Sequence, residues 1–256
     1  MTTSNKKKIF IALFTLVLLS GGCAYLEAHR QPVILTYHTL GTDFAWLAPY
    51  IDPQTFEKQM ALIKKGGYRV ITLDEMVANI KTGENPRKTL AITFDDGYEN
   101  NLIGAKILAK YGFPATIFAV AARMGTVKGY MTPDQAREME KTTPVRIASH
   151  TMTHPYLPKQ SDAVIRREII DSKLTLEKML GHPVAYFAYP EGGYTPGIVA
   201  IVKEAGYEAA FTTNRGDGKD VYAIKRVKPT LRDNAISFWV KFSGYYYIGK
   251  KTKKGH

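Results

Sequence analysis

The 256-residue sequence predicts an α/β fold of parallel strand–helix units closed into a barrel. Short apolar runs alternate with helical patterns along most of the chain, which indicates seven or eight such units in a single domain. Acidic and histidine side chains also follow several of the apolar runs. In a βα barrel the carboxyl ends of the strands share one face, and that face carries the active site. Hydrophobic residues make up 45% of the chain, enough to fill one substantial core.

The N-terminal segment has the composition of an export signal. Three lysines at positions 6–8 precede the apolar run IFIALFTLVLL, and small residues follow it. This order is typical of a secretory signal, which we place at residues 1–22. The run has 11 residues, and about 20 are needed to cross a bilayer. An uncleaved signal anchor is the alternative interpretation.

Cys23 is the only cysteine of the chain, so no intramolecular disulfide can form. The segment LSGGC resembles the lipobox of bacterial lipoproteins, although its leucine lies one position earlier than is usual. The resemblance implies that Cys23 is lipidated and begins the mature chain, with a linker over residues 23–31. We therefore expect an exported lipoprotein held at the bacterial cell envelope, its membrane partner reached through the lipid anchor. A secreted or signal-anchored protein is the alternative.

The chain is strongly basic, with a net charge of +12, or +9 without residues 1–22, which hold three lysines and no acids. Much of the excess lies in the tail, residues 243–256, which ends in GKKTKKGH. A basic tail can bind nucleic acid, anionic lipid or an acidic polymer, or can simply be solvated. Because the chain is expected to be exported and has no nucleic-acid-binding motif, we expect no nucleic-acid partner.

The expected elements follow one another through residues 32–242, which we assign to the catalytic domain. The strand candidates are PVILTYH, YRVITL, TLAITF, ATIFAV, VRIAS, VAYFAYP, EAAFTT and AIKRV. The first helix begins at Asp52, has Pro53 at its first position and ends at the glycine pair 66–67. Further helices are expected over residues 98–111, 133–140, 160–180 and 195–205.

The segment TFDDGY places Asp95 and Asp96 at the end of an apolar strand. Burying a charged group is costly unless the group is paired or binds a metal. Taken alone, the segment is equally consistent with a turn, in which Asp-Gly is common. Its context favours a site, because His38 follows PVILTY, and His150 and His154 follow RIAS.

The segment SHTMTH supplies two imidazoles four residues apart. Histidines at this spacing can bind one metal ion from a helical turn or a tight loop. With a carboxylate from Asp95 or Asp96 they form a set of three ligands that leaves coordination positions open, as in catalytic rather than structural zinc sites. One acid can then bind the metal while the other acts as a base.

A glycoside hydrolase would also use two acids on a barrel, but it needs them on opposite sides of the scissile bond, about 5–10 Å apart. The neighbouring Asp95 and Asp96 can hardly straddle a sugar, and the histidine pair would then have no function. The sequence therefore favours metal-assisted chemistry over glycoside hydrolysis.

The segments TFDDGY, HTMTH and FAYPEGGY resemble the signature motifs of the polysaccharide deacetylases, the NodB-homology or carbohydrate esterase family 4 group. The early YH element and the FAYP segment resemble the branch that acts on the poly-β-1,6-N-acetylglucosamine of biofilms. The resemblance covers residues from about 32 to about 230. It implies a distorted (β/α) barrel of about seven strands. It also implies a metal-dependent hydrolase that removes N-acetyl groups from an envelope or extracellular N-acetylglucosamine polysaccharide and releases acetate. A non-catalytic carbohydrate-binding relative is the alternative.

Transferred motif by motif, the resemblance implies that Asp95 is the general base and that Asp96, His150 and His154 hold the metal. His38 of the early YH element becomes the general acid, because the late-strand histidine that serves many relatives is missing here. Two imidazoles and one carboxylate suit Zn²⁺, or Co²⁺ and Ni²⁺, better than Mg²⁺ or Ca²⁺. Zn²⁺ is the expected cofactor.

The FAYP segment departs from the pattern of many relatives, which carry a base-orienting arginine where this chain has Ala188. The sequence alone does not identify the group that orients Asp95 instead. Tyr189 and Pro190 are the expected substrate or oxyanion residues, with a backbone N–H near Tyr189 as the donor.

Overall fold

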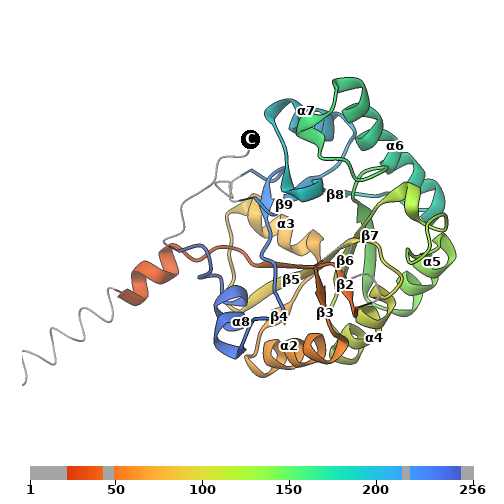
Figure 1. The fold of residues 1–256 in the computed structure, drawn as a ribbon. Helices are drawn as coiled ribbons and strands as arrows, with labels where there is room; N and C mark the ends of the chain where they lie inside the picture. Colours follow the sequence, from red (N-terminus) through yellow and green to blue (C-terminus); the bar gives the residue numbers. More distant parts are fainter. Residues whose placement is uncertain (1–21, 43–48, 215–219, 249–256) are drawn as a thin grey trace, which may run out of the picture.

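The computed structural model describes residues 22–42, 49–214 and 220–248 (Figure 1). The expected signal, apart from its last residue, and the lysine-rich end of the tail lie outside the described residues. Residues 22–28 are helical, and Cys23 in this helix is exposed. None of the described helices combines the length and apolar character that a membrane crossing requires.

Among the described residues, seven parallel strands form a nearly closed ring (Figure 1). In ring order they are β1 (Ile34–Tyr37), β5 (Thr89–Asp96), β6 (Ala115–Ala119), β7 (Val145–Ser149), β8 (Tyr186–Ala188), β9 (Ala209–Thr212) and β10 (Ile224–Lys225). Val227, just after β10, accepts a hydrogen bond from Thr36 N (2.9 Å) and donates one to Ile34 O (2.8 Å). These two bonds join β10 to β1, which confirms the expected seven-stranded barrel.

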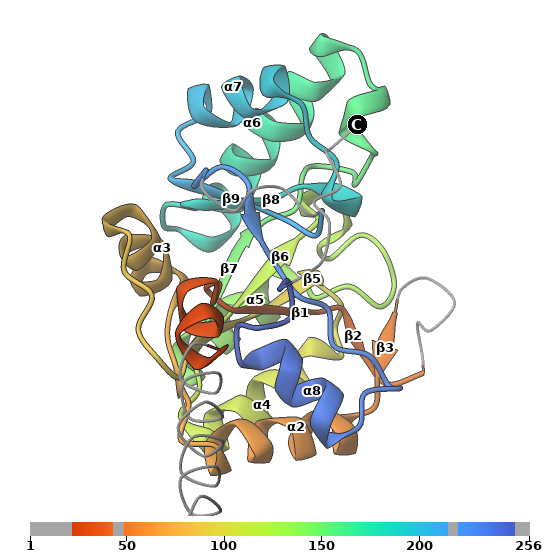
Figure 2. The same ribbon diagram turned by 90° about the vertical axis from the view of Figure 1, so that its left-hand side faces the viewer.

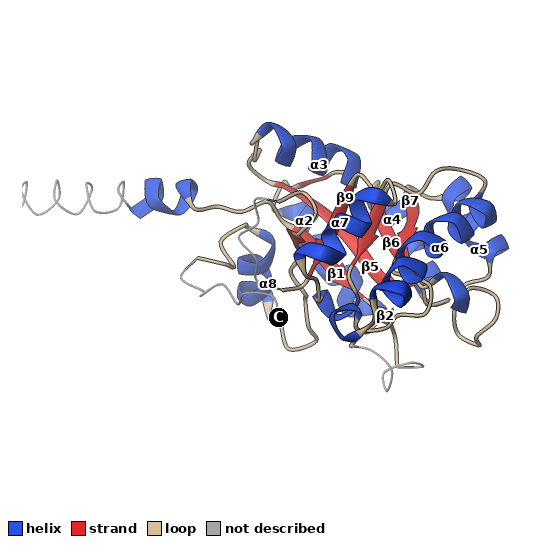
Figure 3. Cartoon of the chain, turned by 90° about the horizontal axis from the view of Figure 1, so that it is seen from above, coloured by secondary structure: helices blue, strands red, loops and turns tan. Residues whose placement is uncertain are grey.

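The remaining elements surround this ring. Three short strands lie off its path: β4 (Arg69–Val70) pairs with β5, and β2 (Thr39–Leu40) pairs with β3 (Tyr50–Ile51). The α-helices are α2 (Pro53–Lys65), α3 (Leu73–Thr82), α4 (Asn101–Tyr111), α5 (Pro133–Thr142), α6 (Asp162–Leu180), α7 (Pro196–Glu204) and α8 (Ala235–Phe242). Three 3-10 turns are η1 (Ala121–Arg123), η2 (Leu157–Lys159) and η3 (Pro190–Gly192). Seen from above, the strands lie in the middle and the helices outside (Figure 3).

Two helices, α3 and α8, were not predicted from the sequence. Thr72, expected within the strand YRVITL, instead caps α3 by accepting a hydrogen bond from Glu75 N (3.2 Å). Asn234 caps α8 by accepting bonds from two backbone N–H groups of its first turn. Both are ordinary N-cap residue types. The strand YRVITL is therefore wrong in length, because β4 ends at Val70.

Alternation along the strands separates the inside of the ring from the outside. The inward side chains form one buried cluster with α3: Ile34, Leu73, Met76, Val77, Ala91, Phe118, Ala148, Ala188, Phe211 and Ile224 are among its members. Intervening residues such as Leu35, Ile92 and Ile117 belong to the cluster beneath the helices. Since residues two apart on a strand share a face, this pattern directs Asp95 inward at the carboxyl end of β5.

Candidate active site

The three predicted metal ligands come together at the carboxyl end of the ring. Asp96 ends β5, His150 directly follows β7, and His154 lies in the loop after it. Asp96 Oδ1 is 3.8 Å from His150 Nε2 and 3.4 Å from His154 Nε2, and the ligand atoms all lie within 4.8 Å of one another. Ligand atoms about 2.0–2.1 Å from a tetrahedral ion are about 3.3 Å apart. The three side chains therefore fit one divalent ion.

The orientation of His150 is fixed by the backbone. Its Nδ1 donates to Ala188 O at 2.8 Å, which leaves Nε2 to face Asp96. Burial lowers the pKa of His150 to about 4, although the nearby acids oppose this shift. The imidazole is therefore neutral near pH 7, the form in which histidine binds metal.

The loop that carries the histidines is held in an unusual conformation by a buried glutamate. Thr151 and His154 in this loop have positive φ angles of 69° and 70°, a conformation that costs a non-glycine residue about 1–3 kcal/mol. Glu168 of α6 accepts hydrogen bonds from Met152 N (2.9 Å), Thr153 N (2.8 Å) and Thr153 Oγ1 (2.6 Å). These bonds anchor the strained loop. Glu168 was not predicted from the sequence, because no motif marks it.

Asp95 is paired with Arg226, a residue that was not predicted from the sequence. Arg226 Nη1 and Nη2 donate to Asp95 Oδ1 and Oδ2 at 2.6 and 2.8 Å, and the two side chains are 0% and 4% exposed. Arg226 Nη1 also donates to Thr93 Oγ1 (3.2 Å), and its guanidinium lies 5.0 Å from the centre of the Phe118 ring. Burial alone would raise the pKa of Asp95, but Arg226 and the neighbouring histidines hold it well below its usual range. Asp95 is thus an ionised and firmly oriented carboxylate.

Arg226 supplies the orienting group that is missing at Ala188. It lies within the strand candidate AIKRV, directly after β10, and continues the inward row begun by Ile224. A charged residue in an inward strand position is the signal that could have identified it. The bond to Asp95 itself could not be read from the sequence, because 131 positions separate the two residues.

The predicted acid, His38, lies next to the same cavity. It follows β1, and its carbonyl oxygen accepts a hydrogen bond from Asn101 Nδ2 at 2.6 Å. Its Nε2 lies 3.3 Å from Lys228 Nζ. Burial lowers the pKa of His38, while Asp95 partly opposes that effect.

These groups line one cavity of about 330 Å³. Its lining consists of His38, Pro49, Asp95, Asp96, His150, His154, Tyr189, Glu191, Gly192, Thr213 and Lys228. The Tyr189 N–H donates to Phe211 O at 3.0 Å, and Pro190 has no N–H to donate. Neither residue can therefore supply the expected backbone N–H donor to an oxyanion. Tyr189 forms part of the wall, and its hydroxyl donates to Tyr222 O at 2.9 Å.

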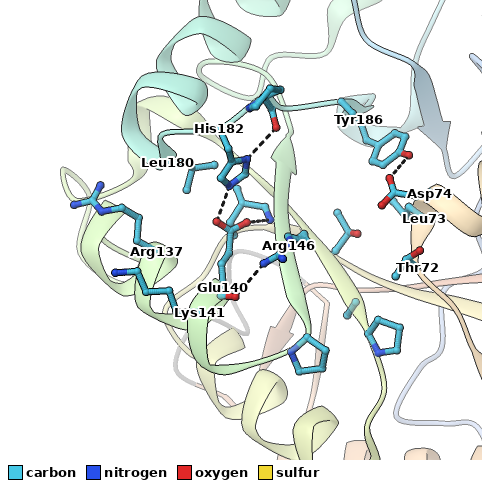
Figure 4. Close-up of a pocket in the computed structure, with 17 residues that line it drawn as sticks. Thr72, Leu73, Asp74, Arg137, Glu140, Lys141, Arg146, Leu180, His182 and Tyr186 are labelled. Carbon is cyan, nitrogen blue, oxygen red and sulfur yellow. Dashed lines mark hydrogen bonds and ion pairs between the residues drawn. The ribbon is translucent and has the colours of Figure 1, made fainter.

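A larger hollow of about 970 Å³ lies at the other end of the strands, around the amino ends of β6, β7 and β8 (Figure 4). His182 in its wall bonds Glu140 Oε2 at 2.8 Å and Pro183 O at 2.9 Å. The Tyr186 hydroxyl donates to Asp74. The hollow contains neither the paired acids nor the three-ligand set, so the smaller cavity is the candidate active site.

Comparison with known proteins assigns the chain to a family. The family model for polysaccharide deacetylases matches residues 82–210, half of the chain. YxkH of Bacillus subtilis (strain 168), named as a polysaccharide deacetylase, is 29% identical over 215 residues, which cover 81% of this chain and 75% of YxkH. A Staphylococcus aureus poly-β-1,6-N-acetyl-D-glucosamine N-deacetylase is 27% identical over 211 residues, or 75% of this chain and 71% of its own length.

A solved structure supports the same assignment. The Streptococcus pyogenes deacetylase PplD, determined in complex with acetate, matches with a TM-score of 0.75 and 25% sequence identity. The match covers 83% of this chain and 98% of PplD. The segment matched by the family model contains both TFDDGY and HTMTH. The chain belongs to the polysaccharide deacetylase family.

Proposed function

We propose that the protein is a metal-dependent N-deacetylase that hydrolyses the acetamido groups of an N-acetylglucosamine polymer. The observation that carries this proposal is the position of Asp95. It is ionised, clamped by Arg226, and lines the same cavity as the ligand set Asp96, His150 and His154. A non-catalytic carbohydrate-binding protein would have no need for a base and a metal set in one cavity.

A divalent ion held by Asp96, His150 and His154 would polarise the acetamide carbonyl and lower the pKa of water. Three protein ligands leave room for such chemistry, whereas a structural zinc site is closed by four. The nitrogen-rich donor set suits Zn²⁺ first, with Co²⁺ and Ni²⁺ as alternatives.

The hydrolysis needs two proton transfers, one from the attacking water and one to the leaving amine. Asp95 accepts the proton of the attacking water. Both of its oxygens bond Arg226, yet each retains a lone pair for this purpose. The leaving amine takes its proton in the part of the cavity that His38 lines. The products are acetate and a free glucosamine unit.

The polymer we place first is poly-β-1,6-N-acetylglucosamine. The name of the S. aureus relative, which is 27% identical over most of this chain, supports this choice. Peptidoglycan and chitin oligomers are the other substrates to test. We further propose that a lipid on Cys23 holds the enzyme at the bacterial cell envelope, for which the segment LSGGC and the exposure of Cys23 are the support.

The decisive experiment measures acetate release by the purified protein from these three polymers, with and without a chelator. We expect release from at least one polymer, loss of release with chelator, and recovery when Zn²⁺ is restored. A protein that binds a polymer but releases no acetate with Zn²⁺, Co²⁺ or Ni²⁺ would instead be a carbohydrate-binding relative.

A further inference from the structure

A second basic residue, Lys228, lies where the ring closes. It follows Arg226 by two positions, beyond the end of β10. The bonds of Val227 to β1 bring this segment beside the residue that follows β1, which is His38. Lys228 Nζ lies 3.3 Å from His38 Nε2, and both side chains line the cavity that holds Asp95.

Only one hydrogen fits between these two nitrogens. When the Lys228 ammonium donates it, His38 Nε2 is an acceptor, and the imidazole is the neutral tautomer with its hydrogen on Nδ1. His38 Nδ1 is buried and has no hydrogen-bond partner among the described residues. In this arrangement His38 offers no hydrogen to a substrate in the cavity. The ammonium carries three hydrogens, so two are left after the bond to His38.

The charges around Lys228 suit a proton donor. Asp95 and Asp96 favour its charged form, while burial and the neighbouring Arg226 oppose it. Burial is the largest of these effects, and the pKa of Lys228 lies below its ordinary value. A general acid is most effective when its pKa is near the working pH, and a buried lysine reaches that range more readily than an exposed one.

We propose that Lys228 delivers the proton to the leaving amine and that His38 holds the ammonium in place. The inference rests on the proposed deacetylase function and refines the role of His38 in it. As the C–N bond breaks, its electron pair stays on the nitrogen, which takes a proton from Lys228 Nζ. Lys228 is then a neutral amine, and Asp95 holds the proton taken from water. Solvent returns a proton to Lys228 and accepts one from Asp95, so the enzyme ends in its starting state.

The test replaces Lys228 in two ways. Lys228→Met removes the charge and the proton, whereas Lys228→Arg keeps a charge but does not release a proton at working pH. With a β-1,6-linked N-acetylglucosamine oligomer, we expect both variants to lose about 10²–10⁴-fold in kcat, the usual contribution of general acid catalysis. Lys106→Met, which removes an exposed charge from α4, should behave like wild type. Bound Zn²⁺, measured by elemental analysis, should be unchanged in all three.

A second substrate separates proton delivery from structural damage. The 4-nitrophenolate of 4-nitrophenyl acetate leaves without taking a proton, so its release should stay close to the wild-type rate in both Lys228 variants. An active Lys228→Arg variant, or equal losses on the amide and the ester, would overturn the assignment while leaving the deacetylase intact. A wild-type protein that releases no acetate from any polymer would overturn the proposed function and this inference with it.

Discussion

Arg226→Met tests whether the clamp on Asp95 stabilises the fold as well as the active site. The pair is bidentate, and its side chains are 0% and 4% exposed. Removing one member of a buried ion pair costs about 3–5 kcal/mol, because the other charge is left unpaired. For a chain of this size each kcal/mol shifts Tm by about 2–4 °C, so we expect Tm to fall by about 6–20 °C. Thermal unfolding followed by circular dichroism measures the change.

The same substitution changes how activity depends on pH. In the wild type the folded-state pKa of Asp95 is depressed. The ionised Asp95 therefore stabilises the folded state at pH values above its unfolded-state pKa, about 3.9. This stabilisation is lost only as the pH falls through the lower pKa of the folded state. Without Arg226 the effect of burial dominates, and the pKa of Asp95 rises. We expect Arg226→Met to gain activity with increasing pH over a range in which Asp95 of the wild type is already ionised.

A double-mutant cycle shows whether these losses come from the pair itself. Arg226→Met with Asp95→Asn removes both charges of the pair, so the double variant should be more stable than Arg226→Met alone. Its activity should stay low, because the base is missing. An Arg226→Met variant with the Tm and the pH profile of the wild type would refute the role assigned to the Asp95–Arg226 ion pair.

Three further predictions concern the metal site and the anchor. Asp96→Asn should lose bound metal, with partial recovery of activity in excess metal, whereas Asp95→Asn should keep the metal and lose most turnover; elemental analysis beside acetate release separates the two. If both variants kept metal and activity, TFDDGY would be a turn and not a site. Glu168→Gln removes the charged acceptor that holds the loop between His150 and His154. It should weaken zinc affinity by about 10–100-fold, the range found when groups that orient metal ligands are lost, and zinc titration against a competing chelator would show no change if the loop does not need Glu168. Cys23→Ser should release the protein from membranes or leave it unprocessed, and a Cys23 that takes up no labelled fatty acid would contradict the anchor.

The sequence predicted the features that depend on local order. The strand–helix alternation predicted the barrel, and the histidine spacing in HTMTH predicted a metal set completed by Asp95 or Asp96. The resemblance to the polysaccharide deacetylases implied that Asp96 is the carboxylate ligand, and Asp96, His150 and His154 do lie together. Helix caps are harder to predict: the sequence predicts YRVITL as one strand, although Thr72 already caps α3. Short apolar runs suit a strand end and a helix start equally well.

The features that could not be predicted are contacts between distant parts of the chain. The Asp95–Arg226 pair spans 131 positions and the His38–Lys228 contact spans 190. Both depend on the bonds between Val227 and β1 that close the ring. No local pattern encodes such a contact, because it exists only when the first and last strands of the ring meet.

This closing contact also explains how the chain can lack an arginine at Ala188. Ala188 ends β8 and Arg226 follows β10, so both positions lie near the carboxyl end of the ring. In a barrel the strands converge on a common interior, and a side chain from one strand end can replace a side chain from another. An orienting guanidinium is therefore required at a place in space rather than at a place in the sequence. The arginine that follows β10 meets this requirement, and the same strand end brings Lys228 beside His38. Closure of the ring thus places both Arg226 and Lys228 in the candidate active site.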